Sequence, residues 1–175
     1  WEEFLLPKII VPAITDNVNY APDLTGYFSN DKTSIVVSED WRYLLTILNS
    51  AVSWWLTQQL FASKQGGFFE FKPMYVSAIP IPQVTNDQRT VLEPLVEATI
   101  QGISRPEYER LLNGLVYELF FPEDLHAQNI RLFDACSAAG IRDGMDAQAK
   151  ATEIFHPRHP IYGQLFELQT LEVVR

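Results

Sequence analysis

The side chains best suited to binding chemistry cluster around a pair of glycines. Lys64 and Gln65 precede Gly66-Gly67, and Lys72 follows shortly after them. These residues offer a cation, an amide and backbone N–H groups that no side chain covers. Such groups suit a phosphate or the edge of a base. The same residues also fit the end of a helix followed by a core strand, because glycine commonly ends helices. Both interpretations stay open from the sequence.

A second group of candidates lies in the segment 13–32, which is rich in Asn, Asp, Pro, Gly and Tyr and has no sustained period. A polar segment of this length predicts an exposed loop, and long loops often carry function. Tyr20, Tyr27 and Phe28 could stack on a base, or they could fold back and hold the loop in place. The same segment holds the polar side chains Asn17, Asn19, Asn30 and Lys32.

Residues for catalysis are missing from the sequence. It has no glycine-rich phosphate loop, no nucleophile elbow and no zinc-binding histidine pair on a helix. His156 and His159 flank a proline and have no carboxylate or cysteine nearby, so we expect no metal site. Cys136 lies on an apolar helical face and should be an inert core residue. The sequence therefore predicts that this fragment is not an enzyme.

Composition limits the possible partners. The 175 residues include 13 Lys and Arg against 22 Asp and Glu, which gives a net charge of −9, and 47% are hydrophobic. Such a chain should fold around a core and should not attract nucleic acid or anionic membranes broadly, so any DNA contact must be local. A single cysteine and no apolar stretch of spanning length indicate a cytoplasmic location. Trp1 leads straight into an apolar strand, which predicts a piece excised from a longer polypeptide.

In residues 1–83, the apolar pattern predicts a long helix that positions the glycine turn. A long helix from about 39 to 60 carries an apolar stripe with the spacing of one buried face, and it ends at the turn. Strands are predicted at 8–12, 33–37, 68–72 and 75–79. The expected fold class is α+β, a small mixed sheet with one long packed helix, followed by a mainly α-helical extension.

Residues 84–175 predict that helical extension. Thr85 with Gln88 and Ser104 with Glu107 each form a capping box, and Pro122 suits the first turn of a further helix. Weaker helical patterns cover 146–155 and 163–174. The apolar stripes of these helices predict a layer packed on the first part of the chain.

Five short patterns in a fixed order resemble a known family. They are LPKIIVP at 6–12, GYFSN at 26–30, YLLTILNS at 43–50, GGFFEFK at 66–72 and IPIP at 79–82. Together they are similar to the TaqI-like C-terminal specificity domain over about residues 5–83. NGLVYELFF at 113–121 also resembles the helical tail that follows this domain in larger fused enzymes.

The resemblance implies a non-catalytic target-recognition domain of adenine-specific DNA methyltransferases and of fused type II restriction-modification enzymes. Such a domain would read double-stranded DNA in the major groove while the catalytic domain of the same polypeptide flips and methylates adenine. The Asn-Pro-Pro-Tyr motif and a glycine motif for S-adenosylmethionine are absent, so this cofactor is expected in that separate domain. The expected DNA-binding residues are Lys64, Gln65, Gly66, Gly67, Lys72, Lys32, Asn30, Tyr20, Asn17 and Asn19.

Other positions of the matched patterns should be scaffold. Leu44, Leu45, Leu48, Trp55 and the corner 79–82 are expected to be buried or to set the shape. Glu70 has two interpretations: it accepts a hydrogen bond from a cytosine amine, or it pairs with a nearby lysine.

An alternative of a different class is a protein-interaction module. In it the acidic helical half docks onto another domain or subunit, and the first half is only a scaffold. This alternative explains the net charge more directly. A basic strip along the glycine turn favours DNA, whereas an acidic surface with an exposed apolar patch favours docking. A hydrolase with an unrecognised site is a third possibility.

Overall fold

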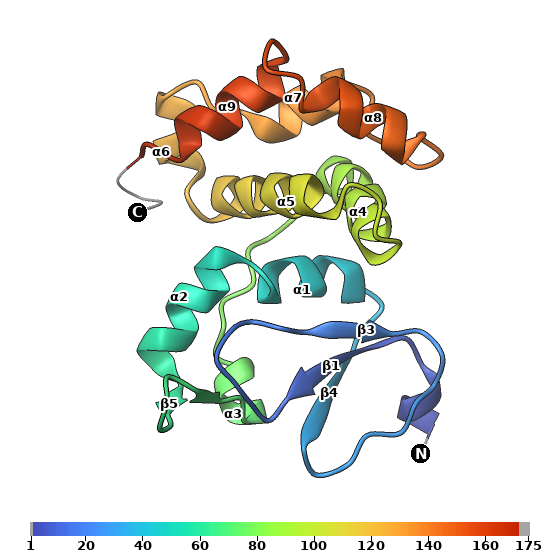
Figure 1. Cartoon of the computed structure of the whole chain (residues 1–175), viewed down its shortest axis with the longest axis vertical. Coiled ribbons are helices and arrows are strands. Elements are labelled where there is room, and N and C mark those ends of the chain that lie inside the picture. Colours follow the sequence, from blue (N-terminus) through green and yellow to red (C-terminus); the bar gives the residue numbers. More distant parts are fainter. Residues whose placement is uncertain (1, 172–175) are drawn as a thin grey trace. The chain divides into compact units, whose positions relative to one another are not determined.

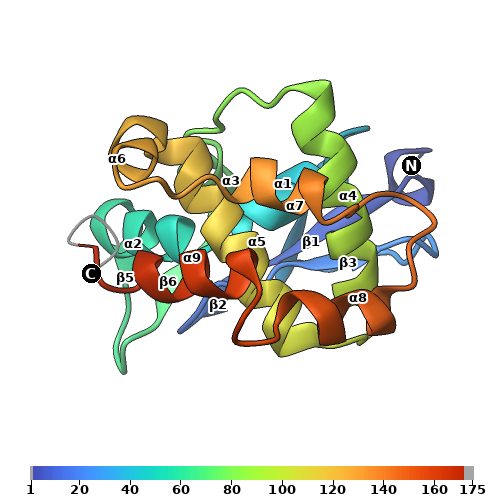
Figure 2. The same cartoon turned by 90° about the horizontal axis from the view of Figure 1, so that it is seen from above.

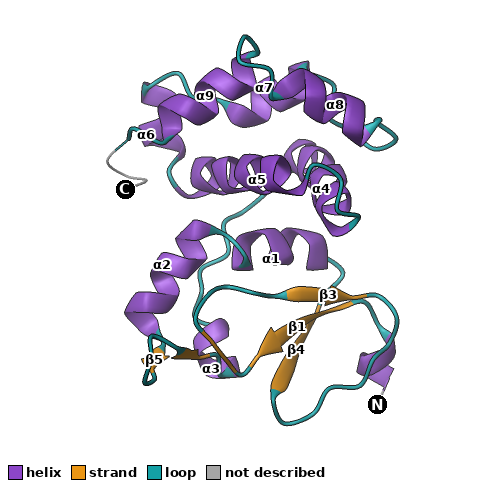
Figure 3. Cartoon of the chain, in the orientation of Figure 1, coloured by secondary structure: helices purple, strands orange, loops and turns teal. Residues whose placement is uncertain are grey.

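The computed structural model describes residues 2–171 and divides the chain into two units, Trp1–Ile81 and Pro82–Arg175 (Figure 1). The fold class is α+β, as predicted. Within the described residues, every strand belongs to the first unit and the second unit is helical (Figure 3). Each unit is described by itself below.

The first sheet of the first unit is built around the strand β1 (Lys8–Pro12). This strand pairs antiparallel with β3 (Ala21–Asp23) on one side and with β4 (Thr33–Val37) on the other. Ile9 and Val11 alternate into the core, which is the period expected of a half-buried strand. Helix α1 (Trp41–Leu48) covers β1 and β3. The predicted strands at 8–12 and 33–37 are therefore confirmed.

The first unit has a second antiparallel sheet, whose first strand begins two residues after the end of β1. Its order is β2 (Ile14–Thr15), β6 (Phe69–Glu70) and β5 (Ala62–Ser63). The expected single mixed sheet is thus wrong in detail, because the unit has two antiparallel sheets. Strands β2 and β3 lie in the segment predicted as loop, where two or three residues are too few to show a period.

The long helix expected over 39–60 is two helices, α1 and α2 (Ala51–Leu60). Ser50 separates them: its backbone is extended, and its hydroxyl accepts from the N–H of Ser53 as a helix N-cap. The hydroxyls of Ser50 and Ser53 both donate to the carbonyl of Ile47, each at 2.6 Å. These bonds satisfy a buried helix end, so the break costs little.

The break explains why the burial prediction for Trp55 is wrong. A helical period that runs through 39–60 places Trp55 on the buried face, but the chain changes direction at Ser50 and the period restarts. Trp55 is 60% exposed. By contrast Leu45 and Leu48 are buried, and at the corner 79–82 Ile79 is buried while Ile81 is exposed.

The predicted strand at 75–79 is also wrong. Residues Pro73–Val76 form a short helix, α3, with Pro73 at its start. Proline suits this position because its fixed φ is helical and it has no N–H to leave unpaired. A short 3-10 helix, η1 (Glu2–Leu5), precedes β1.

The second unit consists of helices packed around a leucine-rich core. Helices α4 and α5 lie side by side, and α7 and α9 pack on α5 (Figure 2). None of the described helices is long and apolar enough to cross a membrane. The bounds are α4 (Asn86–Ile100), α5 (Arg105–Phe120), α6 (Pro122–Ala127), α7 (Leu132–Ala138), α8 (Ala147–Ile154) and α9 (Pro160–Leu168).

Some of the predicted helix starts of this unit are confirmed and one is wrong. The Thr85–Gln88 capping box is confirmed, with both reciprocal hydrogen bonds present. The Ser104–Glu107 box is wrong, because Ser104 has a positive φ of 41° and makes no side-chain cap bond. Pro122 begins α6 as predicted. Of the helix expected at 163–174, α9 covers the first part, and residues 172–174 lie outside the described residues.

Gly114 lets α5 approach two neighbouring helices closely. A Cβ at this position would lie 2.7 Å from Leu132 on α7 and 2.7 Å from Leu165 on α9. Both leucines are buried, so they have little room to move. The absence of a side chain at Gly114 is therefore a packing requirement of this unit.

Candidate nucleic-acid interface

The glycine turn is the tip of a β-hairpin. Strands β5 and β6 pair antiparallel, and the backbone N–H of Lys64 donates to the carbonyl of Phe68 at 2.7 Å. Gly66 and Gly67 both have positive φ, 82° and 83°, which only glycine adopts readily. The helix-end interpretation of this turn is thus wrong, since α2 already ends at Leu60. Gln65 is exposed at the tip beside the glycines.

Strand alternation gives this sheet one packed face and one open face. Phe69 points to the packed face, where its ring meets the edge of Trp54 at 5.5 Å. Phe71 is buried next to Phe61, with ring centroids 5.0 Å apart. Glu70 lies on the opposite face, opposite Ile14 and Ala62 in the register. This open face carries the polar groups of the hairpin.

Glu70 pairs with both lysines that flank the hairpin. Its Oε2 lies 3.3 Å from Lys64 Nζ and 3.2 Å from Lys72 Nζ. The pairing interpretation of Glu70 is therefore confirmed. The hydrogen bond from Lys72 lowers the pKa of Glu70, partial burial opposes this effect, and Lys64 adds to the lowering. Because its pKa is lowered, the carboxylate is ionised at neutral pH, and with 21% of the side chain exposed it remains accessible.

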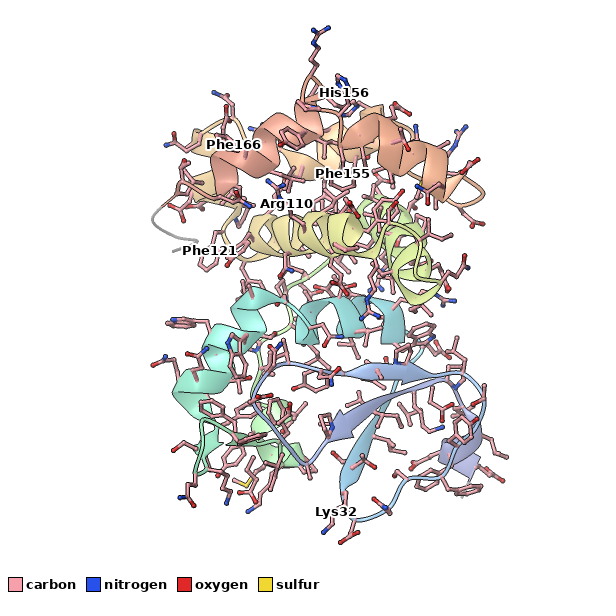
Figure 4. The ribbon with its side chains drawn as sticks, in the orientation of Figure 1. Lys32, Arg110, Phe121, Phe155, His156 and Phe166 are labelled. Atoms are coloured by element: carbon pink, nitrogen blue, oxygen red, sulfur yellow. The ribbon has the colours of Figure 1, made fainter. Side chains whose placement is uncertain are left out.

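Backbone bonds bring Lys32 toward this hairpin. The N–H of Ala13 donates to the carbonyl of Lys32 at 2.9 Å, and the N–H of Phe71 donates to the carbonyl of Ala13 at 2.8 Å. Ala13 thus bonds to Lys32 through its N–H and to Phe71, the residue before Lys72, through its carbonyl. Its side chain projects from the loop before β4 and pairs with Asp31 at 3.1 Å (Figure 4). Asn30 is exposed beside it and accepts from the N–H of Lys32.

The remaining loop candidates divide by burial. Asn17 and Asn19 are exposed in the connection between β2 and β3. Tyr20, by contrast, lies in the core against Phe71, and burial raises its pKa. The side-chain amide of Asn49 accepts from the N–H of Tyr20 and donates to its carbonyl, both at 2.9 Å. A base could not stack on this buried ring, so Tyr20 is an aromatic residue folded back to hold the loop.

Sequence reasoning missed a buried ion pair in the first sheet. Lys8 has no exposed surface, and its Nζ contacts Asp23 Oδ2 at 2.5 Å and donates to the carbonyl of Phe4 at 2.7 Å. The Lys8 bond holds the pKa of Asp23 well below its usual range, and bonds from Thr25 act in the same direction. The available signal was a lysine at the start of a strand that is otherwise apolar.

This ion pair fixes a patch of exposed apolar side chains. Asp23 also accepts from the N–H of Tyr27, and the rings of Phe4 and Phe28 stack with centroids 5.2 Å apart. Tyr27 is 73% exposed. We call this surface the apolar patch; its exposed members are Leu5, Leu24, Tyr27 and Phe28.

In the second unit the chemically reactive side chains have structural roles. His159 accepts from the N–H of Ile161 and caps α9, and His156 accepts from the N–H of Arg158 in the preceding turn. No group of three potential metal ligands occurs among residues 2–171. Burial raises the pKa of the Cys136 thiol, and the charge of Glu118 adds to this effect. Cys136 is therefore a core residue, as predicted.

Comparison with known proteins gives a family match for the first unit. Residues 1–81 match the family model of the TaqI-like C-terminal specificity domain. The match ends where the first unit ends, at Ile81. The predicted resemblance is thus confirmed, and the family points to non-catalytic DNA target recognition in restriction-modification systems. Comparison with curated proteins gives no match for the chain.

Proposed function

We propose that residues 1–81 are the DNA-reading part of an adenine-specific DNA methyltransferase or of a fused restriction-modification enzyme. The observation that carries the proposal is the Lys64–Glu70–Lys72 cluster on the open face of a hairpin within the family-matched unit. A two-stranded ribbon fits the major groove, and its lysines can reach phosphates or base edges. Catalysis and the S-adenosylmethionine site belong to a separate domain of the same polypeptide.

The charge distribution supports a local interface. The chain carries a net charge of −9, so its overall field repels DNA. Lys64 and Lys72 are each about half exposed, with side-chain exposures of 43% and 53%. Affinity is then modest and strongly dependent on salt, and the catalytic domain supplies the other phosphate contacts.

Binding to random duplex DNA at low salt tests the proposal. We expect repeated selection from a random library to enrich one short sequence motif. Lys72→Ala should weaken binding to all sequences and reduce the salt slope by about 1, because a phosphate contact carries no sequence information. Arg105→Ala removes an exposed, ion-paired cation from the second unit and is the matched control. Selection without any enriched motif would contradict the proposed function.

The same protein should transfer no methyl groups. Incubation of the chain with labelled S-adenosylmethionine and duplex DNA is expected to leave the DNA unlabelled. Incorporation above a control without protein would show that the reaction occurs in this fragment.

The apolar patch favours a second candidate function, docking onto another protein domain. The buried ion pair holds this loop beside several exposed apolar side chains, and exposed apolar patches are typical of protein contacts. We infer that the catalytic methyltransferase domain is its partner. Hydrogen exchange with and without DNA separates the two surfaces: DNA should protect residues 62–72 and leave residues 24–28 unchanged. Protection of 24–28 alone would assign DNA contact to the patch instead.

A further inference from the structure

The geometry of Glu70 is unusual for a surface ion pair. Two ammonium groups, one from each side of the hairpin, converge on the same oxygen, Oε2. Both of these contacts are to Oε2, and no hydrogen bond to Oε1 is found among residues 2–171. Two ion pairs of the second unit, Arg105 with Glu109 and Lys150 with Glu153, each involve one lysine or arginine.

Two lysines on one oxygen do more than neutralise a charge. They restrain the carboxylate from both sides, so its second oxygen has a defined position on the open face of the sheet. An ionised carboxylate can only accept hydrogen bonds. The cluster therefore presents one acceptor with a donor on either side of it.

The major-groove edges of DNA include the complementary pattern. Adenine N6 is an amino group next to the acceptor N7, and its partner thymine carries the acceptor O4. Cytosine N4 is an amino group next to the guanine acceptor O6. Guanine and thymine present only acceptors on their own edges, and these would repel Glu70. A donor flanked by an acceptor is thus the chemistry that this cluster recognises.

We propose that Glu70 is a specificity-determining residue, which accepts a hydrogen bond from the exocyclic amino group of a base while Lys64 donates to the neighbouring acceptor. This inference rests on the proposed function, because it assumes that the hairpin faces DNA. It assigns base selection to Glu70 and Lys64 and leaves the phosphate contact to Lys72. Adenine N6 and cytosine N4 are the two possible sources of the amino group.

The experiment compares sequence motifs selected by the wild-type chain and by Glu70→Gln from one random duplex library. We expect Glu70→Gln to lose preference at a single adenine or cytosine position, by about 5- to 150-fold, and to keep the other positions. Glu153→Gln, which neutralises an exposed carboxylate paired with one lysine in the second unit, should select the wild-type motif.

Removing the amino group alone then identifies its source. Purine replaces adenine, or 2-pyrimidinone replaces cytosine, at the position that Glu70→Gln relaxes. Wild-type binding should fall on the duplex lacking the amino group, whereas Glu70→Gln should lose little more, since coupled partners are not additive. The base whose modification weakens wild-type binding is the one read.

The outcomes separate base selection by Glu70 from DNA recognition by the first unit. An identical motif for wild type and Glu70→Gln would overturn the role of Glu70 and leave DNA recognition standing. Equal losses from amino-group removal in both proteins would also overturn it. If the wild-type chain selects no motif, both the inference and the proposed function fail. An unchanged melting temperature for Glu70→Gln shows that any loss of preference comes from the site.

Discussion

Different kinds of contact stabilise the interior of each unit. The first unit pairs polar groups inside the fold, with Lys8 buried against Asp23 and the partly buried Asn49 bonded to the backbone of Tyr20. The second unit relies on apolar helix packing, with buried leucines of α7 and α9 against Gly114 of α5. Polar pairs fix the course of irregular loops, whereas close helix packing needs only shape. Loops can therefore carry recognition in the first unit, and the second is a packed bundle.

Breaking the buried ion pair should give the largest effect. We expect Lys8→Met to lower the free energy of unfolding by about 3–5 kcal/mol, because it leaves Asp23 buried without its cation. Urea denaturation measures the change. Lys32→Met, which removes an exposed lysine paired with an exposed aspartate, is the control and should unfold like the wild type. Equal midpoints for both variants would mean that the buried pair does not hold the first unit.

Acid should weaken the first unit through the same pair. The pKa of Asp23 is lower in the folded chain than in the unfolded chain, where it is about 3.9. The ionised carboxylate therefore stabilises the fold above that pH, and this contribution is lost as the pH falls toward the folded pKa. The difference in unfolding free energy between wild type and Asp23→Asn should shrink from about pH 7 to about pH 3. A difference independent of pH would contradict the assignment.

A smaller effect is expected from a single methyl group in the second unit. Gly114→Ala should lower the free energy of unfolding by about 1–3 kcal/mol, since the added Cβ meets two buried leucines. Gly163→Ala is the matched control on α9, where an added Cβ meets nothing within 4 Å. That control should instead stabilise the chain by about 0.5–1 kcal/mol, because alanine favours a helix over glycine. Thermal unfolding of both variants tests the sign.

Glu118 differs from the rest of the second unit's core, because it is a buried carboxylate among apolar side chains. Its Oε1 lies 2.9 Å from His126 Nε2, and its Oε2 accepts from the N–H of Phe133 at 3.0 Å. Glu118→Gln should cost only about 1 kcal/mol, because an amide can serve both partners. Glu118→Leu should cost more, since it leaves the Phe133 N–H without an acceptor. Equal losses would show that the charge itself is required.

The sequence predicted contacts that are local in the chain. Lys64, Glu70 and Lys72 lie on one short hairpin, so strand alternation and the glycines were sufficient to expect their pairing. The helices of the second unit follow from apolar spacing of three and four. In both cases the information lies within a few residues.

Contacts between distant segments could not be predicted. Tyr20 was a candidate for stacking because its partners, Asn49 and Phe71, are remote in sequence. The exposure of Trp55 depends on the break at Ser50, which the apolar period does not reveal. The buried pair of Lys8 and Asp23 requires the register of β1 with β3, and that register is visible only in the structure.

The Asn49 amide has a consequence for the chemical ageing of this protein. It stands in for a peptide group, with one acceptor and one donor facing the backbone of Tyr20. Deamidation to aspartate would turn the donor into an acceptor and set a negative charge against the Tyr20 carbonyl. Aspartate could still accept from the Tyr20 N–H, so the loop would lose one of its two hydrogen bonds to the end of α1. Chemical ageing at this one side chain would therefore weaken the attachment of the loop while the packing of Tyr20 on Phe71 remains.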